Sequence, residues 1–172
     1  MMENLNIRLS RSRRTRKVPS PILSRGPHDV TGLARVLSLT AYYAGAALLL
    51  WSSYLHYHLW HDLGYHAIPH IGDLFVAQIV ADVFIAVVVA TLRQVWTALL
   101  GAGATILTIV GFLLAVTHGI LGFRESWTAP DAQLDFFVEV ATLVALTLAT
   151  VVSVRPTNTG PRSSTHTRPL PR

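Results

Sequence analysis

The chain has 172 residues, of which 51% are hydrophobic and 13% are charged, whereas an average soluble domain carries about 25% charged residues. This composition excludes an ordinary soluble globule, and it also excludes a wholly disordered chain, which would be poor in apolar residues. The absence of cysteine excludes disulfide frameworks, thiolate metal sites, iron–sulfur ligation and cysteine nucleophiles. The net charge is +5, but most arginines lie in two polar end segments, so the charge does not indicate a nucleic-acid binder.

The first 31 residues are polar and basic. They contain a basic cluster made of Arg8, Arg11, Arg13, Arg14, Arg16 and Lys17. Such a segment buries too little apolar surface to offset the entropy of ordering it, so we predict a disordered tail over residues 1–31. The cluster favours contact with anionic lipid. A cytoplasmic partner is a less favoured alternative, and we expect no nucleic acid because no aromatic residues interleave the arginines.

Four apolar segments follow, each long enough to supply the roughly 20 residues that a spanning helix needs. We predict spanning helices over about 34–60, 73–92, 95–121 and 132–154, within a transmembrane domain of residues 32–154. A second polar tail, residues 155–172, is predicted to be disordered. Apolar runs of this length without turn residues favour helices over strands. The predicted fold class is therefore all-α, a membrane four-helix antiparallel bundle with disordered polar tails.

Basic residues are distributed unevenly around these spans. If the N-terminus is cytoplasmic, Arg124 is the one residue among the 14 Lys and Arg that lies on the outer side. The positive-inside rule therefore predicts a multi-pass protein of the plasma membrane with both termini in the cytoplasm. Tyrosines and tryptophans gather after the first span, as expected at a membrane–water boundary.

Each predicted span carries a stripe of small or polar residues at spacings of three and four, which places them on one helix face. The stripe of the first span is Ser38, Tyr42, Gly45, Leu49, Ser52 and His56. The second has Gln78, Asp82, Ala86 and Ala90; the third Ala104, Thr108, Gly111, Ala115, His118 and Gly122; the fourth Asp135, Glu139, Thr142, Leu146, Ala149 and Ser153. In lipid such stripes face other helices, because small residues permit close approach.

Four ionisable residues of these stripes are the candidate proton or ligand sites: His56, Asp82, His118 and Glu139. A charged side chain at a helix centre costs roughly 2.5–3.5 kcal/mol on insertion scales, so such residues need an explanation. The rise per residue places Asp82 near the midplane and Glu139 in the outer half. Two interpretations are open. The acids form hydrogen bonds across helices, to Tyr42, Ser52 or Thr108, or they form a proton, metal or ligand site.

The outer loops are rich in histidine and carboxylate, which are ligands for zinc. His58, His61 and Asp62 share a face if the first helix continues that far, and they are the candidate metal ligands there. The spacing matches no strict metal signature, so a solvated histidine-rich loop is the alternative. No cofactor is expected from the sequence. Haem held between His56 and His118 is a further, less favoured hypothesis.

No catalytic motif of the GxSxG, P-loop or GxGxxG type occurs in the sequence, so we do not expect an enzyme. The leading hypothesis is an integral membrane protein that acts as a packing or accessory subunit, as a homo-oligomer or within a larger membrane complex. The alternative is an outward-facing proton or metal site, conceivably haem, that serves transport or redox chemistry.

Three stretches occur together in this chain: HYHLW at residues 56–60, GYHAIPHIGDLF at 64–75 and GILGFRE at 119–125, with Glu139 following in the fourth span. This pattern resembles a family of small four-span integral membrane proteins of actinobacteria. The likeness covers roughly residues 33–154 and is most specific at the two outer loops, whereas His70 and Asp73 depart from the family pattern. The resemblance implies the fold and the membrane location, and it implies no particular activity.

Overall fold

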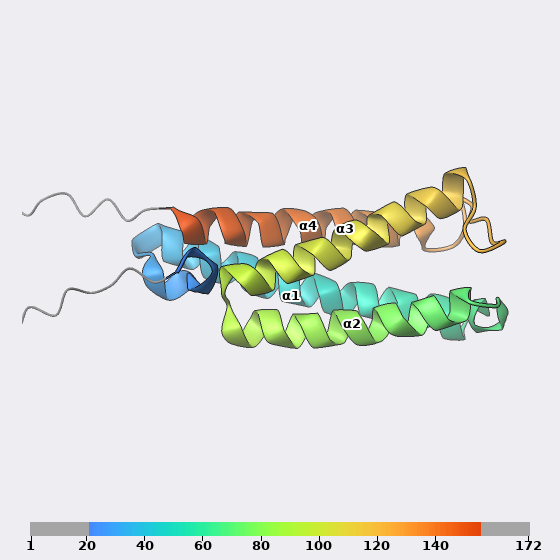
Figure 1. The fold of residues 1–172 in the computed structure, drawn as a ribbon, viewed down its shortest axis with the longest axis horizontal. Coiled ribbons are helices and arrows are strands. Elements are labelled where there is room, and N and C mark those ends of the chain that lie inside the picture. Colours follow the sequence, from blue (N-terminus) through green and yellow to red (C-terminus); the bar gives the residue numbers. More distant parts are fainter. Residues whose placement is uncertain (1–20, 156–172) are drawn as a thin grey trace, which may run out of the picture.

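The structure is a computed structural model that describes residues 21–155. The predicted disordered tails fall mostly on residues 1–20 and 156–172, which lie outside the described residues, as does the basic cluster. The described chain contains four long helices: α1 (Gly32–His61), α2 (Ile71–Leu92), α3 (Val95–Thr117) and α4 (Ala132–Val154). Each is long and apolar enough to cross a membrane. Consecutive helices run in opposite directions (Figure 1), which confirms the all-α membrane bundle.

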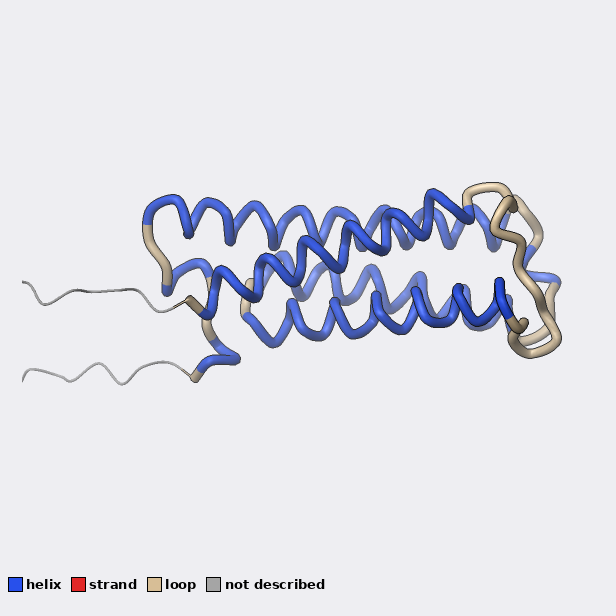
Figure 2. The backbone as a smooth tube through the Cα atoms, turned by 90° about the horizontal axis from the view of Figure 1, so that it is seen from above, coloured by secondary structure: helices blue, strands red, loops and turns tan. Residues whose placement is uncertain are grey.

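Both ends of the described chain lie at one end of the bundle (Figure 2). We call this the termini end; it contains residues 21–31, the α2–α3 turn and Arg155. The opposite end, which holds the α1–α2 and α3–α4 connections, is the loop end. The bundle therefore presents two chemically different ends, one with the chain termini and one with the histidine-rich connections.

The predicted span boundaries agree with three helices to within two residues, but the third was predicted too long. It ends at Thr117 and not at residue 121. Gly119 has φ +82°, a left-handed conformation that glycine adopts without steric cost. The N–H groups of His118 and Gly119 both donate to the Leu114 carbonyl, which closes the last turn. Residues 120–123 then form a separate turn.

Residues 21–31 were predicted to belong to a disordered tail, and the structure corrects this. They form two short 3-10 helices, η1 (Ile22–Ser24) and η2 (Pro27–Asp29). The Val95 N–H donates to the Arg25 carbonyl at 2.9 Å, and the Arg25 guanidinium donates to the Val154 carbonyl at 3.3 Å. The segment is ordered because it satisfies backbone groups at the start of α3 and the end of α4 that no helix hydrogen bond can use.

The stripes predicted for the first, second and fourth spans do face the interior of the bundle. On α3 the predicted stripe is only partly interior. Ala115 is buried, whereas His118 and Gly122 lie exposed beyond the helix, and the most buried face runs through Ala98, Gly101 and Thr105. The reason is close packing: a Cβ on Gly101 would lie 2.7 Å from Leu146 Cδ1, so the glycine face turns toward that leucine. α1 packs extensively on α2 and α4, whereas α2 and α3 contact each other least of the neighbouring pairs. They diverge toward the loop end (Figure 1).

We expect Gly45→Ala to lower the thermal stability of the protein in detergent. A Cβ at this position would lie 2.5 Å from Leu146 Cδ2, and overpacking of this kind costs about 1–3 kcal/mol. Gly103→Ala is the matched control, because nothing lies within 4 Å of its added Cβ. If the melting temperature of Gly45→Ala is equal to or higher than that of Gly103→Ala, this packing is contradicted. Adding Leu146→Val to Gly45→Ala should restore part of the lost stability.

Candidate functional site

A buried polar cluster lies in the half of the bundle nearer the loop end. Its members are Ser52 and His56 of α1, Asp82 of α2, and Asp135 and Glu139 of α4, and none is more than 6% exposed. Residues four apart on one helix share a face, so α1 and α4 each present two successive members to the interior. Among the described residues, no Lys or Arg forms a hydrogen bond or ion pair with these three acids.

The Ser52 hydroxyl connects two of the acids across three helices. Its Oγ lies 2.5 Å from Glu139 Oε1 and 3.0 Å from Asp82 Oδ2. A hydroxyl carries one hydrogen and can donate it to one carboxylate only. The other contact is a hydrogen bond when that carboxyl itself carries a proton. On the opposite side, the Gln78 amide donates to Asp82 Oδ1 at 3.0 Å, so Asp82 is held by two neutral groups.

His56 and Asp135 form the part of the cluster that lies nearest the loop end. His56 Nδ1 lies 3.0 Å from the Ser52 carbonyl and 3.5 Å from Asp135 Oδ1. Asp135 Oδ1 and Glu139 Oε2 are buried and have no hydrogen-bond partner among the described residues. Ligand atoms of His56, Asp135 and Glu139 lie within 4.8 Å of one another, and within residues 21–155 this is the one trio of this kind. The trio combines an imidazole with carboxylate oxygens that have unused hydrogen-bonding capacity.

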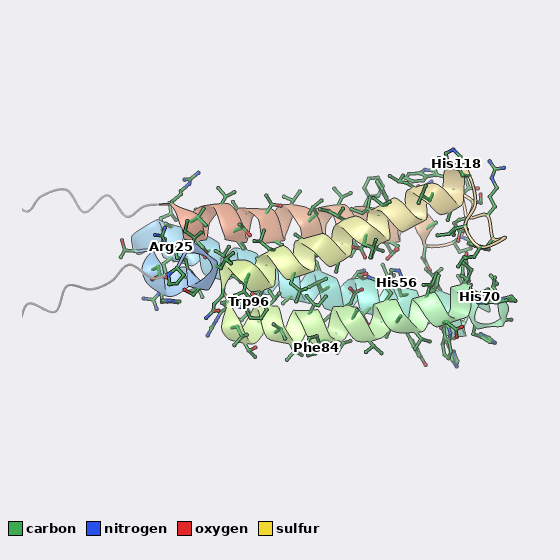
Figure 3. The ribbon with its side chains drawn as sticks, in the orientation of Figure 1. Arg25, His56, His70, Phe84, Trp96 and His118 are labelled. Carbon is green, nitrogen blue, oxygen red and sulfur yellow. The ribbon has the colours of Figure 1, made fainter. Side chains whose placement is uncertain are left out.

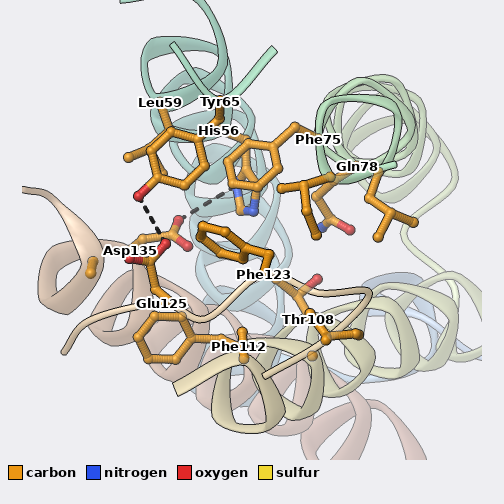
Figure 4. A pocket seen from close by; sticks show the side chains of 16 residues that line it. His56, Leu59, Tyr65, Phe75, Gln78, Thr108, Phe112, Phe123, Glu125 and Asp135 are labelled. Carbon is orange, nitrogen blue, oxygen red and sulfur yellow. Dashed lines mark hydrogen bonds and ion pairs between the residues drawn. The ribbon is translucent and has the colours of Figure 1, made fainter. Parts of the chain in front are cut away.

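A cavity of about 160 Å³ adjoins His56 and Asp135. It lies between α2 and α3, and its walls are mainly aromatic and aliphatic (Figure 4). At its loop side the Tyr65 hydroxyl donates to Glu125 Oε2 at 2.8 Å. Burial and this bond to a carboxylate raise the pKa of the Tyr65 phenol above its ordinary value. The cavity follows from the fold, because α2 and α3 diverge where it lies.

Toward the termini end, the cluster is closed by an apolar layer. The fully buried side chains of this layer are Leu49, Val89, Leu146 and Ala149, and Ile85 and Ala86 are almost fully buried beside them. The tight contacts of Leu146 with Gly45 and Gly101 leave no space beside it. The buried cluster is therefore adjoined by a cavity on its loop side and by packed hydrocarbon on its termini side.

The structure brings together three of the four candidate proton or ligand residues, namely His56, Asp82 and Glu139. His118 lies apart from them, exposed at the loop end of α3, where its ring contacts Thr117 (Figure 3). It is displaced because α3 ends one residue before it. The pair His56 and His118 is therefore not assembled to hold haem between two axial ligands.

Of the partners proposed for the two acids, Ser52 supplies the hydrogen bonds. The Thr108 hydroxyl donates instead to the Ala104 carbonyl in its own helix. Asp135 was not among the predicted site residues, although the stripe of the fourth span placed it on the same helix face as Glu139. Its spacing of four residues from Glu139 is the signal that could have identified it.

The three metal-ligand candidates His58, His61 and Asp62 lie together at the end of α1. Asp62 contacts His61 Nδ1 at 2.7 Å and His58 Nε2 at 3.5 Å, and His58 also contacts Asp131 at 3.2 Å. The hydrogen bond from His61 holds the pKa of the Asp62 carboxyl below its usual range. All of these side chains are partly or fully exposed, so this group is a solvated network of ion pairs at the loop end.

Together, four apolar helices of spanning length and their bundle packing define a multi-pass integral membrane protein. Comparisons with protein-family models, with curated proteins and with solved structures give no match for this chain. The chemistry of the buried cluster and of the adjoining cavity is therefore what indicates a function.

Replacing Ser52 with Ala removes the hydroxyl that connects Asp82 and Glu139. We expect this change to lower the free energy of unfolding by about 1.5–3 kcal/mol, the range for hydrogen bonds to charged groups. Ser53→Ala is the control, because Ser53 donates to the neutral Ile79 carbonyl, and its loss should cost about 1 kcal/mol. Thermal or denaturant unfolding in detergent measures both. If both variants lose the same free energy of unfolding, the Ser52 bridge contributes no more than an ordinary hydrogen bond.

Proposed function

We propose that this protein binds a divalent transition-metal cation from the outer side of the membrane, with His56, Asp135 and Glu139 as ligands. The observation that carries the proposal is the arrangement of these three side chains. Their ligand atoms lie within 4.8 Å of one another. Tetrahedral zinc, with bonds of about 2.0–2.2 Å, needs ligand atoms roughly 3.4 Å apart. A modest contraction of buried side chains would therefore complete three protein ligands around one ion.

The charges of the cluster support a cation. Within residues 21–155, Asp135 Oδ1 and Glu139 Oε2 have no hydrogen-bond partner, and a buried polar atom without a partner costs about 1–3 kcal/mol. A metal ion would bond both oxygens and neutralise charge that no Lys or Arg of the described cluster offsets. One imidazole and two carboxylates suit zinc and neighbouring divalent ions.

Ser52 and Asp82 have a positioning role in this proposal. The Ser52 hydroxyl holds the Glu139 carboxyl, and Asp82 in turn holds Ser52. Hydrogen-bonding partners of metal ligands orient the ligands and tune affinity. The apolar layer around Leu49 and Leu146 closes the termini side, so the described conformation supports binding from one side and not conduction through the bundle.

We also propose that the loop end faces outward, that both termini are cytoplasmic, and that the membrane is the plasma membrane. The support is the distribution of basic residues: Arg25, Arg93 and Arg155 lie at the termini end, and Arg124 lies at the loop end. The basic cluster at residues 8–17 would then contact anionic lipid of the inner leaflet.

The accessory-subunit hypothesis was motivated by the small-residue stripes. Most of these residues on α1, α2 and α4 are buried within this one chain, so they do not indicate a second partner. Association with a further copy or a larger complex has no separate observation behind it. The metal site is therefore the function that the geometry favours.

We expect the purified protein in detergent to bind one Zn²⁺ per chain in a calorimetric titration checked by elemental analysis. His56→Ala, Asp135→Asn and Glu139→Gln should each weaken binding by more than about 100-fold, since even hydrogen-bonding partners of ligands contribute roughly 10–100-fold. Asp82→Asn removes a partner of a ligand and should weaken Zn²⁺ binding by roughly 10–100-fold. His61→Ala is the matched control on the exposed group and should leave affinity unchanged. Absence of Zn²⁺ binding, or its loss in His61→Ala alone, would reject this site.

The proposed orientation can be mapped with single cysteines, since the chain has none of its own. Ala67→Cys and Ser126→Cys, both at the loop end, should react with a membrane-impermeant maleimide in intact cells. Ser163→Cys should react only after the cells are permeabilised. Reaction of Ser163→Cys in intact cells would reverse the orientation and place the metal site on the cytoplasmic side.

A further inference from the structure

The cavity between α2 and α3 is larger than a metal site needs. Its volume is about 160 Å³, and an apolar cavity of roughly 150 Å³ can hold a benzene molecule. The rings of Phe75, Phe112, Phe123 and Tyr65 line it (Figure 4). The Tyr65 ring lies 5.2 Å from Phe75 and 5.8 Å from Phe123, centre to centre. The wall therefore offers several aromatic surfaces to one small ring.

The polar groups of the cavity offer acceptors and few donors. The Tyr65 hydroxyl donates to Glu125, and the Thr108 hydroxyl donates to the Ala104 carbonyl. Within residues 21–155, the charged members of the lining are the acids Glu125 and Asp135, with no Lys or Arg beside them. An anion or a pure acceptor would meet repulsion and no free hydroxyl donor here.

The two acids of the lining differ in what they already bind. Glu125 accepts the Tyr65 hydroxyl and, through Oε1, the Ser126 N–H. Asp135 Oδ1 is buried and accepts no hydrogen bond from the described residues; its one ion-pair contact among them is His56 Nδ1 at 3.5 Å, and the residue is only 6% exposed. Asp135 is thus the carboxylate available to a ligand, and it lies at the inner end of an aromatic cavity.

We infer that this cavity binds a small organic ammonium ion, a protonated amine on an apolar ring-sized body, with the amine on Asp135 and the ring among Phe75, Phe112 and Phe123. A protonated amine supplies the hydrogen bonds that the acceptor-rich end lacks. Its positive charge is attracted both to the carboxylate and to the faces of aromatic rings, worth about 0.5–2 kcal/mol per ring contact.

The position of the cavity matches this ligand class. It lies between two helices whose other faces expose large apolar side chains, at the loop end where α2 and α3 diverge (Figure 1). An amine with an apolar body partitions into this boundary region of a membrane. The inference goes beyond the proposed metal site, but the two ligands would share His56 and Asp135, so each excludes the other.

The test uses metal-free protein in detergent with a chelator present, titrated calorimetrically at pH 8 with benzylammonium chloride. Benzyl alcohol, which has the ring without the charge, and methylammonium, which has the charge without the ring, are the ligand controls. We expect benzylammonium to bind at least about tenfold more tightly than either. Asp135→Asn should weaken its binding by roughly 10–100-fold, the range for a hydrogen bond to a charged group. Phe112→Ala should weaken it as well.

Phe84→Ala is the protein control, since Phe84 is 63% exposed on the outer face of α2, and it should bind benzylammonium unchanged. Saturating Zn²⁺ should abolish benzylammonium binding to the wild-type protein. The inference fails if the wild-type protein does not bind benzylammonium, if benzyl alcohol binds equally well, or if folded Asp135→Asn retains full affinity. If Asp135→Asn does not fold, the ligand series and Phe112→Ala decide. Because Zn²⁺ binding is measured separately, failure of either ligand leaves the result for the other intact.

Discussion

The burial of acidic side chains without a basic partner is the constraint on which the arrangement of this bundle depends. Asp82, Asp135 and Glu139 lie inside an apolar four-helix bundle, where the cost of an isolated charge is high. The Ser52 hydroxyl, placed between Asp82 and Glu139, joins α1, α2 and α4 at one level. The two helix pairs with the most extensive packing are α1 with α2 and α1 with α4. The polar bridge and the packing therefore specify the same helix arrangement.

The same bridge does not reach α3, and this difference creates the site. α3 is held at the termini end, where Gly101 receives Leu146 and residues 21–31 bind the start of the helix. Toward the loop end it has no polar contact with the cluster and diverges from α2 (Figure 1). The space left between them is the aromatic cavity beside His56 and Asp135. Tight packing at one end thus permits an opening at the other.

The two proposals, metal binding in the cluster and ammonium binding in the cavity, depend on different sets of side chains. The proposed metal site would use side chains that lie deeper, including Glu139 on the second turn of α4. The proposed ammonium site would use the aromatic walls and share only His56 and Asp135 with the metal site. Both follow from the excess of carboxylate over basic groups, and neither needs a path through the apolar layer below. Under these two proposals, the protein would bind its cation at one face of the membrane in the conformation described.

The amino-acid sequence by itself determined the four spans, their order and most of the buried faces, because long apolar runs and spacings of three and four are local properties of a helix. It also singled out His56, Asp82 and Glu139, since any ionisable residue inside such a run is anomalous. Tertiary structure alone decided which of them meet. Sequence spacing along separate helices carries no information on their relative rotation or height. The selection of Ser52 over Tyr42 and Thr108 as the bridging residue, the contact of Asp135 with His56 and the exclusion of His118 therefore could not be predicted. The end of α3 at Thr117 and the order of residues 21–31 likewise depend on contacts between distant segments, which no local pattern records.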